Sequence, residues 1–588
     1  ADLTLPEPRI MQRRPQSAAG PPVRTPVPGP AAGPGSCLVA AVALGAAGLG
    51  LALWTAPARA QAGTSSRSHA PSRGDPAGGF RASPYVPLGS WEYPILDYWV
   101  AAGRLEHLSP FVKPYRRMDV ARAILSLQAQ DLEPFERRWL RRLRDEFARE
   151  LAVLRGRRED DAYATVHASA GGADWTQTSR DPLRPRLHGP FARNRLLERV
   201  SVAADGQAGV VATGVRIVRD GIYRHDAQFP GGRVITRRQF PLLDEAGLRF
   251  DEAYAELQTR YARLFVGRMD RNWGPPRTSG FLLSDYAYSW DQIGWRIGSD
   301  RLFLTGVLSS FNDFPGDTAR YFAVHRLEWR ARRNLMLAFS ESIIQGGPNA
   351  RLDWRILNPV ALWETTTTES GANREQRNHL AQADAWWRPV RRLVLSGSLV
   401  ADNSTSVSKT DQSCCGIGGT LQVQLPGVLP GWSLRLRGSA MQSLVYRTSL
   451  NPWERYTVNG IGLGWDKSDL RLVTLEATWL GVGGLVLRPR IDLQQKGESD
   501  MHFPVSPPPD SLPTYPRILV GQAETTIRPA VSGRWHRDLG KGWDVDLDWD
   551  VGVNFIRDYD HQPGVNATAL VGLFRVVLRT PRLLLPLD

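Results

Sequence analysis

The residues best suited to binding chemistry lie in one short stretch, residues 268–275. It brings together Arg268, Asp270, Arg271, Trp273 and a Gly-Pro turn. Arginine forks can hold a uronate or phosphate group, while an indole packs against the apolar face of a sugar ring. The stretch therefore predicts a grip on an acidic sugar. The alternative is a salt-bridge cluster that stiffens the interior of the protein.

Glu341 and Asp402 are acidic residues at expected strand ends. Two carboxylates can hydrolyse a glycosidic bond when their separation suits the reaction. We interpret both instead as structural partners of buried arginines. The sequence has no phosphate-binding glycine loop, zinc-ligand cluster, serine-hydrolase elbow or HExxH spacing, and its ten histidines are scattered. We therefore expect no catalytic residue, no metal site and no cofactor.

The composition argues against helical membrane spans and leaves a β-barrel with a polar lumen open. The chain has 588 residues, a mean hydropathy of -0.31 and 22% charged residues. Its net charge of +14 is carried almost entirely by arginine, a bias that a GC-rich genome would also produce. Acidic residues interrupt these charges throughout, so nucleic-acid binding is not expected. The 20 tryptophans suit membrane-interface belts and stacking on sugars.

The clearest structural pattern occupies residues 543–555, WDVDLDWDVGVNF. Apolar residues fill every second position, and four aspartates, a glycine and an asparagine lie between them. Only an extended chain places these two sets on opposite faces. The stretch exceeds the roughly 5–6 residues of a common soluble strand and fits the about 9–11 of a tilted membrane-crossing strand. Alone, it would also suit a soluble sheet with one wet face.

Similar alternation recurs from residue 163 to residue 588, for example at 253–265, 432–439 and 470–493. Short and long connections both occur in this region, which is typical of outer-membrane barrels. At roughly 20–25 residues per strand and connection, the region supplies about 16–20 antiparallel strands. The predicted fold class is all-β, with a large antiparallel outer-membrane β-barrel over residues 159–588.

The N-terminal part is expected to direct export. Residues 1–62 combine arginines, an apolar run after Cys37 and small residues, which is the order of a cleaved signal peptide; an uncleaved anchor is the alternative. Residues 63–87 are rich in Ser, Gly and Pro and predict a flexible linker. Cys37 would leave with the leader. Cys414 and Cys415 would be free thiols or an unusual vicinal bridge.

Residues 88–158 carry apolar stripes at helical spacing. Three helices are expected, and Pro134 lies at the first turn of the third. We expect this unit to plug the barrel and to depend on docking for stability, because so small a core is marginal alone. Arginines of the third helix should then face acidic residues of the lumen or rim, such as the aspartates of residues 544–550. These arginines are Arg137, Arg138, Arg141, Arg142 and Arg144.

The first two helices of this unit resemble a single S-layer-homology repeat. The resemblance lies in YPILDYWVAAGRLEHL and in RRMDVAR at residues 116–122. The repeat usually ends in Thr-Arg-Ala-Glu, whereas Tyr-Arg-Arg-Met-Asp stands here. The resemblance implies contact with a cell-wall polymer such as peptidoglycan, as the alternative to a plug.

Two further segments resemble the capsule-assembly Wzi family of Gram-negative outer membranes. The first is VGRMDRNWGP at 266–275 with GFLLSD at 280–285. The second combines ESII at 341–344, LNP at 357–359, Asn378 and WWRPVRRLVLSGSLVADN at 386–403. The resemblance implies a barrel of about 18 strands, closed by an N-terminal helical bundle, that holds or organises capsular polysaccharide. The candidate polysaccharide-binding residues are Arg268, Asp270, Arg271, Trp273, Asn358, Trp386 and Trp387.

These observations lead to one preferred function and two alternatives. The preferred function is a monomeric, non-enzymatic outer-membrane barrel that binds or organises an acidic capsular polysaccharide or exopolysaccharide. Its other expected partner is outer-membrane lipid, with peptidoglycan as a further partner through the helical unit. A porin or polysaccharide export channel is the first alternative, and a glycan hydrolase built on the barrel is the second. A plugged lumen would favour the binding barrel, and an open lumen would favour the channel.

Overall fold

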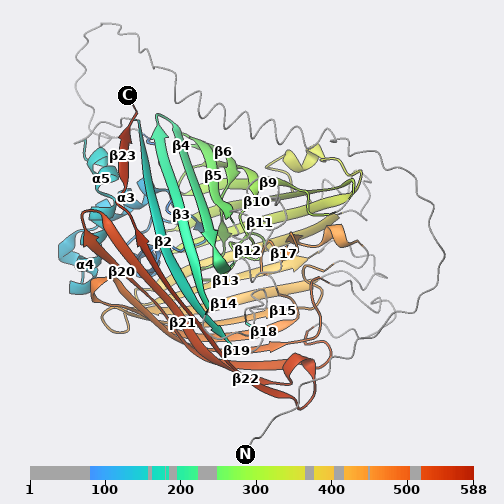
Figure 1. Ribbon diagram of the computed structural model, residues 1–588. Helices are drawn as coiled ribbons and strands as arrows, with labels where there is room; N and C mark the ends of the chain where they lie inside the picture. Colours follow the sequence, from blue (N-terminus) through green and yellow to red (C-terminus); the bar gives the residue numbers. More distant parts are fainter. Residues whose placement is uncertain are drawn as a thin grey trace, which may run out of the picture.

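A computed structural model describes residues 80–156, 162–178, 181–183, 195–222, 248–314, 316–363, 377–402, 416–447, 451–465, 467–502 and 518–587. The expected leader, most of the expected linker, Cys37, Cys414 and Cys415 lie outside these residues. Figure 1 shows a large barrel with a small group of helices at one end.

Within the described residues, 18 antiparallel strand positions close into a barrel. The last position is shared by β22 and β23, which pair with β2 one after the other and so close the ring. The predicted fold class and strand number are confirmed. The strands are β2 (Tyr163–Gln177), β3 (Arg195–Ala208), β4 (Val211–Asp220), β5 (Leu248–Gln258), β6 (Ala262–Arg268), β8 (Asp291–Gly298), β9 (Leu302–Phe311), β10 (Thr318–Arg332), β11 (Leu335–Pro348), β12 (Arg377–Val390), β13 (Leu393–Asp402), β14 (Gly416–Pro426), β15 (Trp432–Met441), β18 (Leu470–Leu480), β19 (Leu485–Lys496), β20 (Glu524–Gly540), β21 (Trp543–Arg557), β22 (Asn566–Arg579) and β23 (Leu583–Pro586).

Strand alternation gives the barrel an apolar outer wall and a polar inner one. In β21, the side chains of Trp543 and Phe555 are 39% and 50% exposed on the outside, while the aspartates between them face the lumen and meet arginines. Similar apolar side chains ring the barrel, and a belt this extensive needs lipid to cover it. They include Val200, Leu257, Leu264, Trp329, Phe339, Leu399, Leu421, Leu436, Val473, Ile491, Val531 and Phe574.

The described helices are all short, and none combines the length and the apolar character needed to cross a membrane. The end of the barrel that carries the helices also carries short connections, at residues 209–210, 333–334 and 541–542. The opposite end carries long ones, such as residues 269–290 and 442–469. Short turns face the periplasm in outer-membrane barrels, so the helices lie on the periplasmic side.

The helical unit consists of α2 (Tyr93–Ala101), α3 (Arg117–Leu125), α4 (Pro134–Glu146) and α5 (Ala148–Leu154). Pro134 begins α4 as predicted, and Glu133 and Glu136 form a capping box there. The expected third helix is two helices, because the backbone bends at Phe147, with φ −101° and ψ 24°. A further short segment, β1 (Val112–Lys113), extends from this unit into the barrel.

The helical unit shares its hydrophobic core with the inside of the barrel. Five wall side chains complete that core: Met336, Trp386, Val394, Leu480 and Val486. Polar contacts reinforce the docking, since the Trp91 ring stacks on His536 at 4.6 Å between centroids and Arg142 donates to the His536 carbonyl oxygen at 2.8 Å. The unit therefore packs against the inner wall and covers the periplasmic end of the lumen.

Of the α4 arginines, Arg142 lies near the acidic residues Asp538 and Asp546 as expected, but none forms an ion pair with the aspartate row among the described residues. Arg137, Arg138 and Arg141 are exposed, and Arg144 donates to the carbonyl oxygen of Leu127. The aspartates instead pair with groups of the barrel itself, because neighbouring strands supply inward-facing partners at the same height. The pairs are Asp544–Arg579, Asp546–His536, Asp546–Arg579, Asp548–Arg534, Asp550–Arg490 and Asp550–Arg528.

Residues 80–87, at the end of the expected linker, lie along the inner face of β5. The Ser83 amide donates to Gln258 at 2.9 Å, and the Tyr85 hydroxyl donates to Glu256 at 2.9 Å. Arg116 of the helical unit donates to the same Gln258 oxygen at 3.0 Å. The chain is therefore held against the barrel before the helices begin.

Two connections from the extracellular end fold into the lumen. The first inward loop is residues 269–290 and the second is residues 442–469, of which 442–447, 451–465 and 467–469 are described. They meet through hydrogen bonds from the hydroxyls of Tyr446 and Tyr456 to the carbonyl oxygens of Phe281 and Leu282, at 2.7 and 2.8 Å. Their apolar side chains form one core with the inner faces of β9–β13, β15 and β18.

The first inward loop also reaches the helical unit. Its short strand β7 (Asn272–Trp273) pairs with β1 in antiparallel register, Val112 opposite Trp273. The Gly274 amide extends the contact by donating to the Phe111 carbonyl oxygen at 3.1 Å. A continuous stack of protein thus runs through one side of the lumen, from the extracellular loops to the periplasmic helices.

Candidate functional site

The predicted sugar-gripping stretch does not form a single open site. Arg268 pairs with Asp291 at 2.7 Å at an exposed position, whereas Arg271 turns inward to Gln292 at 2.7 Å and lies over the Phe265 ring. Trp273 is only 2% exposed and belongs to the core between the loops. Its ring therefore offers no free face to a sugar, which corrects that expectation.

Asp270 lies half-buried in the same loop and forms no ion pair with any described residue. Desolvation raises the pKa of its carboxyl well above the usual range, the nearby Asp251 and Asp285 carboxylates add to the rise, and Arg249 opposes it. Of the stretch 268–275, Arg268, Asp270, Arg271 and Asn272 are partly exposed, whereas Trp273, Gly274 and Pro275 are buried.

The other three predicted residues lie far apart in the fold. Trp386 and Trp387 occupy consecutive positions of β12 and so face opposite ways: Trp386 is 4% exposed beneath the helical unit, and Trp387 is 45% exposed on the outer wall. Asn358 follows the 3-10 helix η3 (Trp354–Leu357) at an exposed position beyond β11. The structure therefore does not bring the seven predicted residues together.

Glu341 and Asp402 are not partners of lumen arginines. Glu341 points outward from β11, where His325 and His379 contact its two carboxylate oxygens at 3.1 and 2.9 Å. The strap of residues 351–363 covers this cluster, with the Trp363 ring stacked on His325 at 4.0 Å. Asp402 accepts from the Tyr446 amide at 2.6 Å inside the barrel. The two carboxyls lie on opposite faces of the wall, so they cannot act as one hydrolytic pair.

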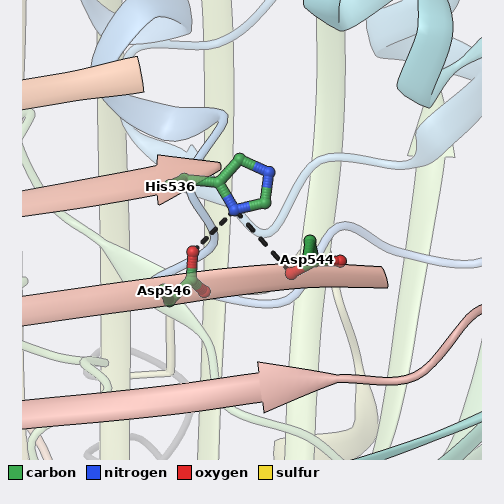
Figure 2. Close-up of side chains that lie close together, drawn as sticks. All are labelled: His536, Asp544 and Asp546. Carbon is green, nitrogen blue, oxygen red and sulfur yellow. Dashed lines mark hydrogen bonds and ion pairs between the residues drawn. The ribbon is translucent and has the colours of Figure 1, made fainter. Parts of the chain in front are cut away.

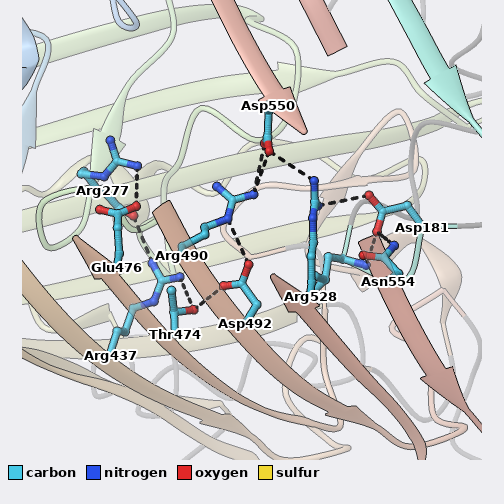
Figure 3. A network of polar contacts seen from close by, with 11 residues as sticks. Asp181, Arg277, Arg437, Thr474, Glu476, Arg490, Asp492, Arg528, Asp550 and Asn554 are labelled. Carbon is cyan, nitrogen blue, oxygen red and sulfur yellow. Dashed lines mark hydrogen bonds and ion pairs between the residues drawn. The ribbon is translucent and has the colours of Figure 1, made fainter. Parts of the chain in front are cut away.

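A lattice of arginines and carboxylates covers the inner faces of β15, β18, β19, β20 and β21, as Figure 3 shows. We call this set the arginine lattice. Its members are Asp181, Arg277, Arg435, Arg437, Thr474, Glu476, Arg490, Asp492, Arg528, Asp550 and Asn554. Strand alternation places its strand members on the lumen side, and two loop residues, Asp181 and Arg277, complete it.

The arginine lattice forms a continuous chain of contacts. At one end, Arg277 and Arg435 share Glu476 at 2.9 and 3.3 Å. In the middle, Arg490 bridges Asp492 at 3.0 Å and Asp550 at 3.1 Å. The links continue from Asp550 to Arg528 at 3.2 Å, from Arg528 to Asp181 at 3.4 Å, and from Asp181 to Asn554 at 2.9 Å.

Within the arginine lattice itself, five arginines meet four carboxylates. Arginine forks that share carboxylates can exchange a protein partner for a carboxylate or phosphate of a ligand, since the geometry of the two contacts is the same. The alternating stretch at residues 432–439 places Arg435 and Arg437 on one face of a strand but does not show what they contact. The alternation of side chains along a strand predicts which arginines face the lumen. Which carboxylate each arginine contacts depends on the register between strands.

His536, Asp544 and Asp546 form a second cluster near the periplasmic end, drawn in Figure 2. The Nδ1 atom of His536 lies 2.7 Å from Asp546 and 3.8 Å from Asp544. The three groups are close enough to approach one metal ion. Arg579, however, pairs with both aspartates and already supplies the positive charge that a metal would bring. The cluster is best described as an ion-pair site under the docked Trp91.

A closed antiparallel barrel with an apolar outer wall, two inward-folding loops and helices docked at its periplasmic end is an outer-membrane β-barrel. Within that class, the model of the family of capsule assembly protein Wzi matches residues 197–394. The family likeness inferred from the sequence is thus confirmed. The matched region contains the first inward loop, and of the arginine lattice it includes Arg277 alone. No curated protein matches the chain.

Among solved structures, the chain is similar to Wzi of Escherichia coli, with 12% sequence identity and a TM-score of 0.56 over 85% of this chain and 99% of that one. That protein is described as an outer-membrane protein involved in group 1 capsule assembly and as a carbohydrate-binding β-barrel. At this identity the likeness establishes the fold.

Two weaker structural matches carry no argument about function. OccD3 of Pseudomonas aeruginosa has 9% identity and a TM-score of 0.41, over 71% of this chain and 92% of that one. A BenF-like porin of Pseudomonas fluorescens Pf-5 has 12% identity and a TM-score of 0.39, over 72% and 99%.

Proposed function

We propose that this protein binds and organises an acidic surface polysaccharide at the outer membrane and does so without enzymatic activity. The observation that carries the proposal is the filled lumen in a barrel that resembles the Wzi family. The helical unit enters from the periplasmic end and the two inward loops enter from the extracellular end. A protein built to pass solutes would keep that space open.

The charge of the interior supports an acidic ligand. Inward-facing arginines outnumber the carboxylates that they contact in the arginine lattice, and arginine suits bidentate contact with uronates and phosphates. The chain acts as a monomer, lipid covers its outer wall, and peptidoglycan is a further partner of the periplasmic helices in this proposal.

The alternatives lose the features on which they rested. A porin or export channel needs a continuous aqueous path, whereas the helical unit and the two inward loops both occupy the lumen in which that path would run. A hydrolase needs two carboxyls across one bond, whereas Glu341 and Asp402 face opposite sides of the wall. We therefore favour a binding barrel.

The proposal is tested by binding of purified full-length protein to immobilised alginate, with neutral dextran as the matched control. Binding to alginate that weakens with added salt and is absent on dextran is the expected result, because screening weakens contacts between exposed charges. Equal binding to both polymers, or to neither, would contradict an acidic ligand.

Two further measurements on the same protein address the alternatives. In planar bilayers the intact chain should pass little current, and steady conductance would favour the channel. Incubation with alginate should release no reducing ends, and their appearance would favour the hydrolase.

A further inference from the structure

A cavity of about 220 Å³ lies between the helical unit and the inner wall, towards the periplasmic end. We call it the arginine chamber. Its lining includes Ser90, Asp97, Arg277, Arg435, Arg488 and Arg534. The volume is many times the about 10–15 Å³ that a single water needs, so the chamber can admit a polar ligand group. The exposed Gly89 lies at its edge and opens it towards the periplasm.

The charges around the chamber do not balance. Arg277 and Arg435 share the single carboxylate of Glu476. Arg534 is paired with Asp548, and the Asp97 carboxylate is held by Lys113 at 2.6 Å. Four arginines therefore line a space in which two carboxylates, Glu476 and Asp548, are available to them.

Arg488 is the unmatched charge. It faces the lumen from β19, forms no ion pair with any described residue, and its buried Nε has no hydrogen-bond partner there. A half-buried guanidinium without an ion pair of its own is costly, because the nearby Glu476 carboxylate, which Arg277 and Arg435 already share, only partly offsets its desolvation. A protein that keeps such a group beside an empty space of this size holds it ready for an anion.

We propose that the arginine chamber binds a small oxyanion group, the carboxylate of a uronic acid or a phosphate, with Arg488 as its principal contact and Arg277 and Arg435 beside it. The planar guanidinium presents parallel N–H donors that match two oxygens of either group. The link to a sugar acid rests on the proposed function, whereas the anion site itself does not. Its position places the anion between the periplasmic helices and the first inward loop, which supplies Arg277.

The inference is tested by isothermal titration of the full-length protein with sodium glucuronate, inorganic phosphate and glucose. The wild-type chain should bind the two anions and not glucose. Arg488→Gln should weaken anion binding at least about tenfold, because the charged bidentate contact is lost. Arg260→Gln is the matched control: it removes the same charge from an exposed periplasmic turn, and binding should be unchanged.

A second variant tests the space without changing any charge. Ser433 lines the chamber and is buried, so Ser433→Phe fills it, and anion binding should again be lost. Each variant is first checked for a closed barrel by its altered gel migration when unheated. Wild-type protein should also melt at a higher temperature in phosphate than in chloride, and Arg488→Gln should abolish that difference.

The outcomes separate the two proposals. Equal anion binding by wild type and Arg488→Gln, or no anion binding by wild type, overturns the chamber even if alginate still binds. Anion binding that depends on Arg488 without any binding of alginate supports the chamber and overturns the polysaccharide function.

Discussion

The two sides of the lumen wall are built on different chemistry. From β9 to β13 the inner face contributes apolar side chains to a core with Phe281, Tyr446 and Tyr456 of the inward loops, beside a buried ion pair between Arg326 and Asp384. From β15 to β21 it carries the arginine lattice, whose contacts pass from carboxylate to guanidinium. The apolar side is sealed by shape, which fixes one arrangement. The charged side is held by partners that a ligand can replace.

Removing the helical unit should have the largest effect on this contrast. Deletion of residues 88–154 should leave the barrel inserted, lower its thermal stability and raise its conductance in planar bilayers. The current should run along the charged side, because the inward loops still fill the apolar side. Excess arginine on that side should make the current selective for anions.

Unchanged conductance after this deletion would contradict the prediction that the helical unit plugs the barrel. The matched measurement is a peptidoglycan pull-down with the same truncated protein, since an independent wall-binding arm would lose that interaction while leaving conductance unaltered.

Among single substitutions, one on the apolar side should cause the largest loss of stability. Phe281 is fully buried between the inward loops and contacts Trp465 edge-on. Phe281→Ala should destabilise the barrel by about 3–5 kcal/mol, the usual cost of emptying such a core position. The loss of stability is measured on gels, as a lower temperature at which the band of the folded barrel changes its migration. Phe574→Ala on the outer wall is the control and should cost much less, because lipid fills the space left there.

A substitution on the charged side should cost less and depend on salt. Glu476→Gln leaves Arg277 and Arg435 without their shared carboxylate, which we expect to cost about 1–3 kcal/mol. Chloride can screen the two guanidiniums, so the loss should shrink as salt is added, unlike that of Phe281→Ala. A cost that is independent of salt would contradict the distinction. Glu106→Gln, in a looser pair with Arg333 at 3.7 Å, should have almost no effect.

The smallest predicted effect is a pH dependence on the apolar side. His502 contacts Asp500 at 2.5 Å and the Gly460 carbonyl oxygen of the second inward loop at 2.7 Å. Burial opposes the charge, but these contacts raise the pKa of His502 above 6.5. A raised folded-state pKa contributes stability that is present below pH 6.5 and lost as the pH rises through the folded value.

Melting measured between about pH 6 and pH 9 should therefore show a small decline that His502→Gln removes. The partner is already ionised throughout this range, because the His502 contacts outweigh burial and lower the pKa of Asp500 to about 2. A decline that persists in the variant would assign the dependence to another group.

The fold could be predicted from the sequence because apolar residues recur at every second position in a strand and at helical spacing in a helix. The alternation in residues 543–555 identified β21 with its outer and inner faces, and Pro134 identified the start of α4. The bend at Phe147 had no such signal, since the apolar spacing continues through it.

The candidate site was harder to predict because it depends on contacts between distant segments. Trp273 became part of the core only because two loops fold inward and meet it. Glu341 met His325 and His379 through strand register, and a strap then covered all three on the outer wall. The aspartates of β21 pair with arginines of neighbouring barrel strands and not with arginines of the helices. The periodic spacing of residues in one sequence does not show which distant segments contact each other.

The antiparallel pair of β1 and β7 makes this protein a mechanical link as well as a seal. Val112 and Trp273 belong to opposite ends of the barrel, yet they are paired within the lumen. Under the proposed function, a pull on a polymer held at the cell surface would pass as tension along the first inward loop into the periplasmic helices. The load would thereby be divided between that internal tether and the wall, so the lipid around the barrel would not have to resist it alone.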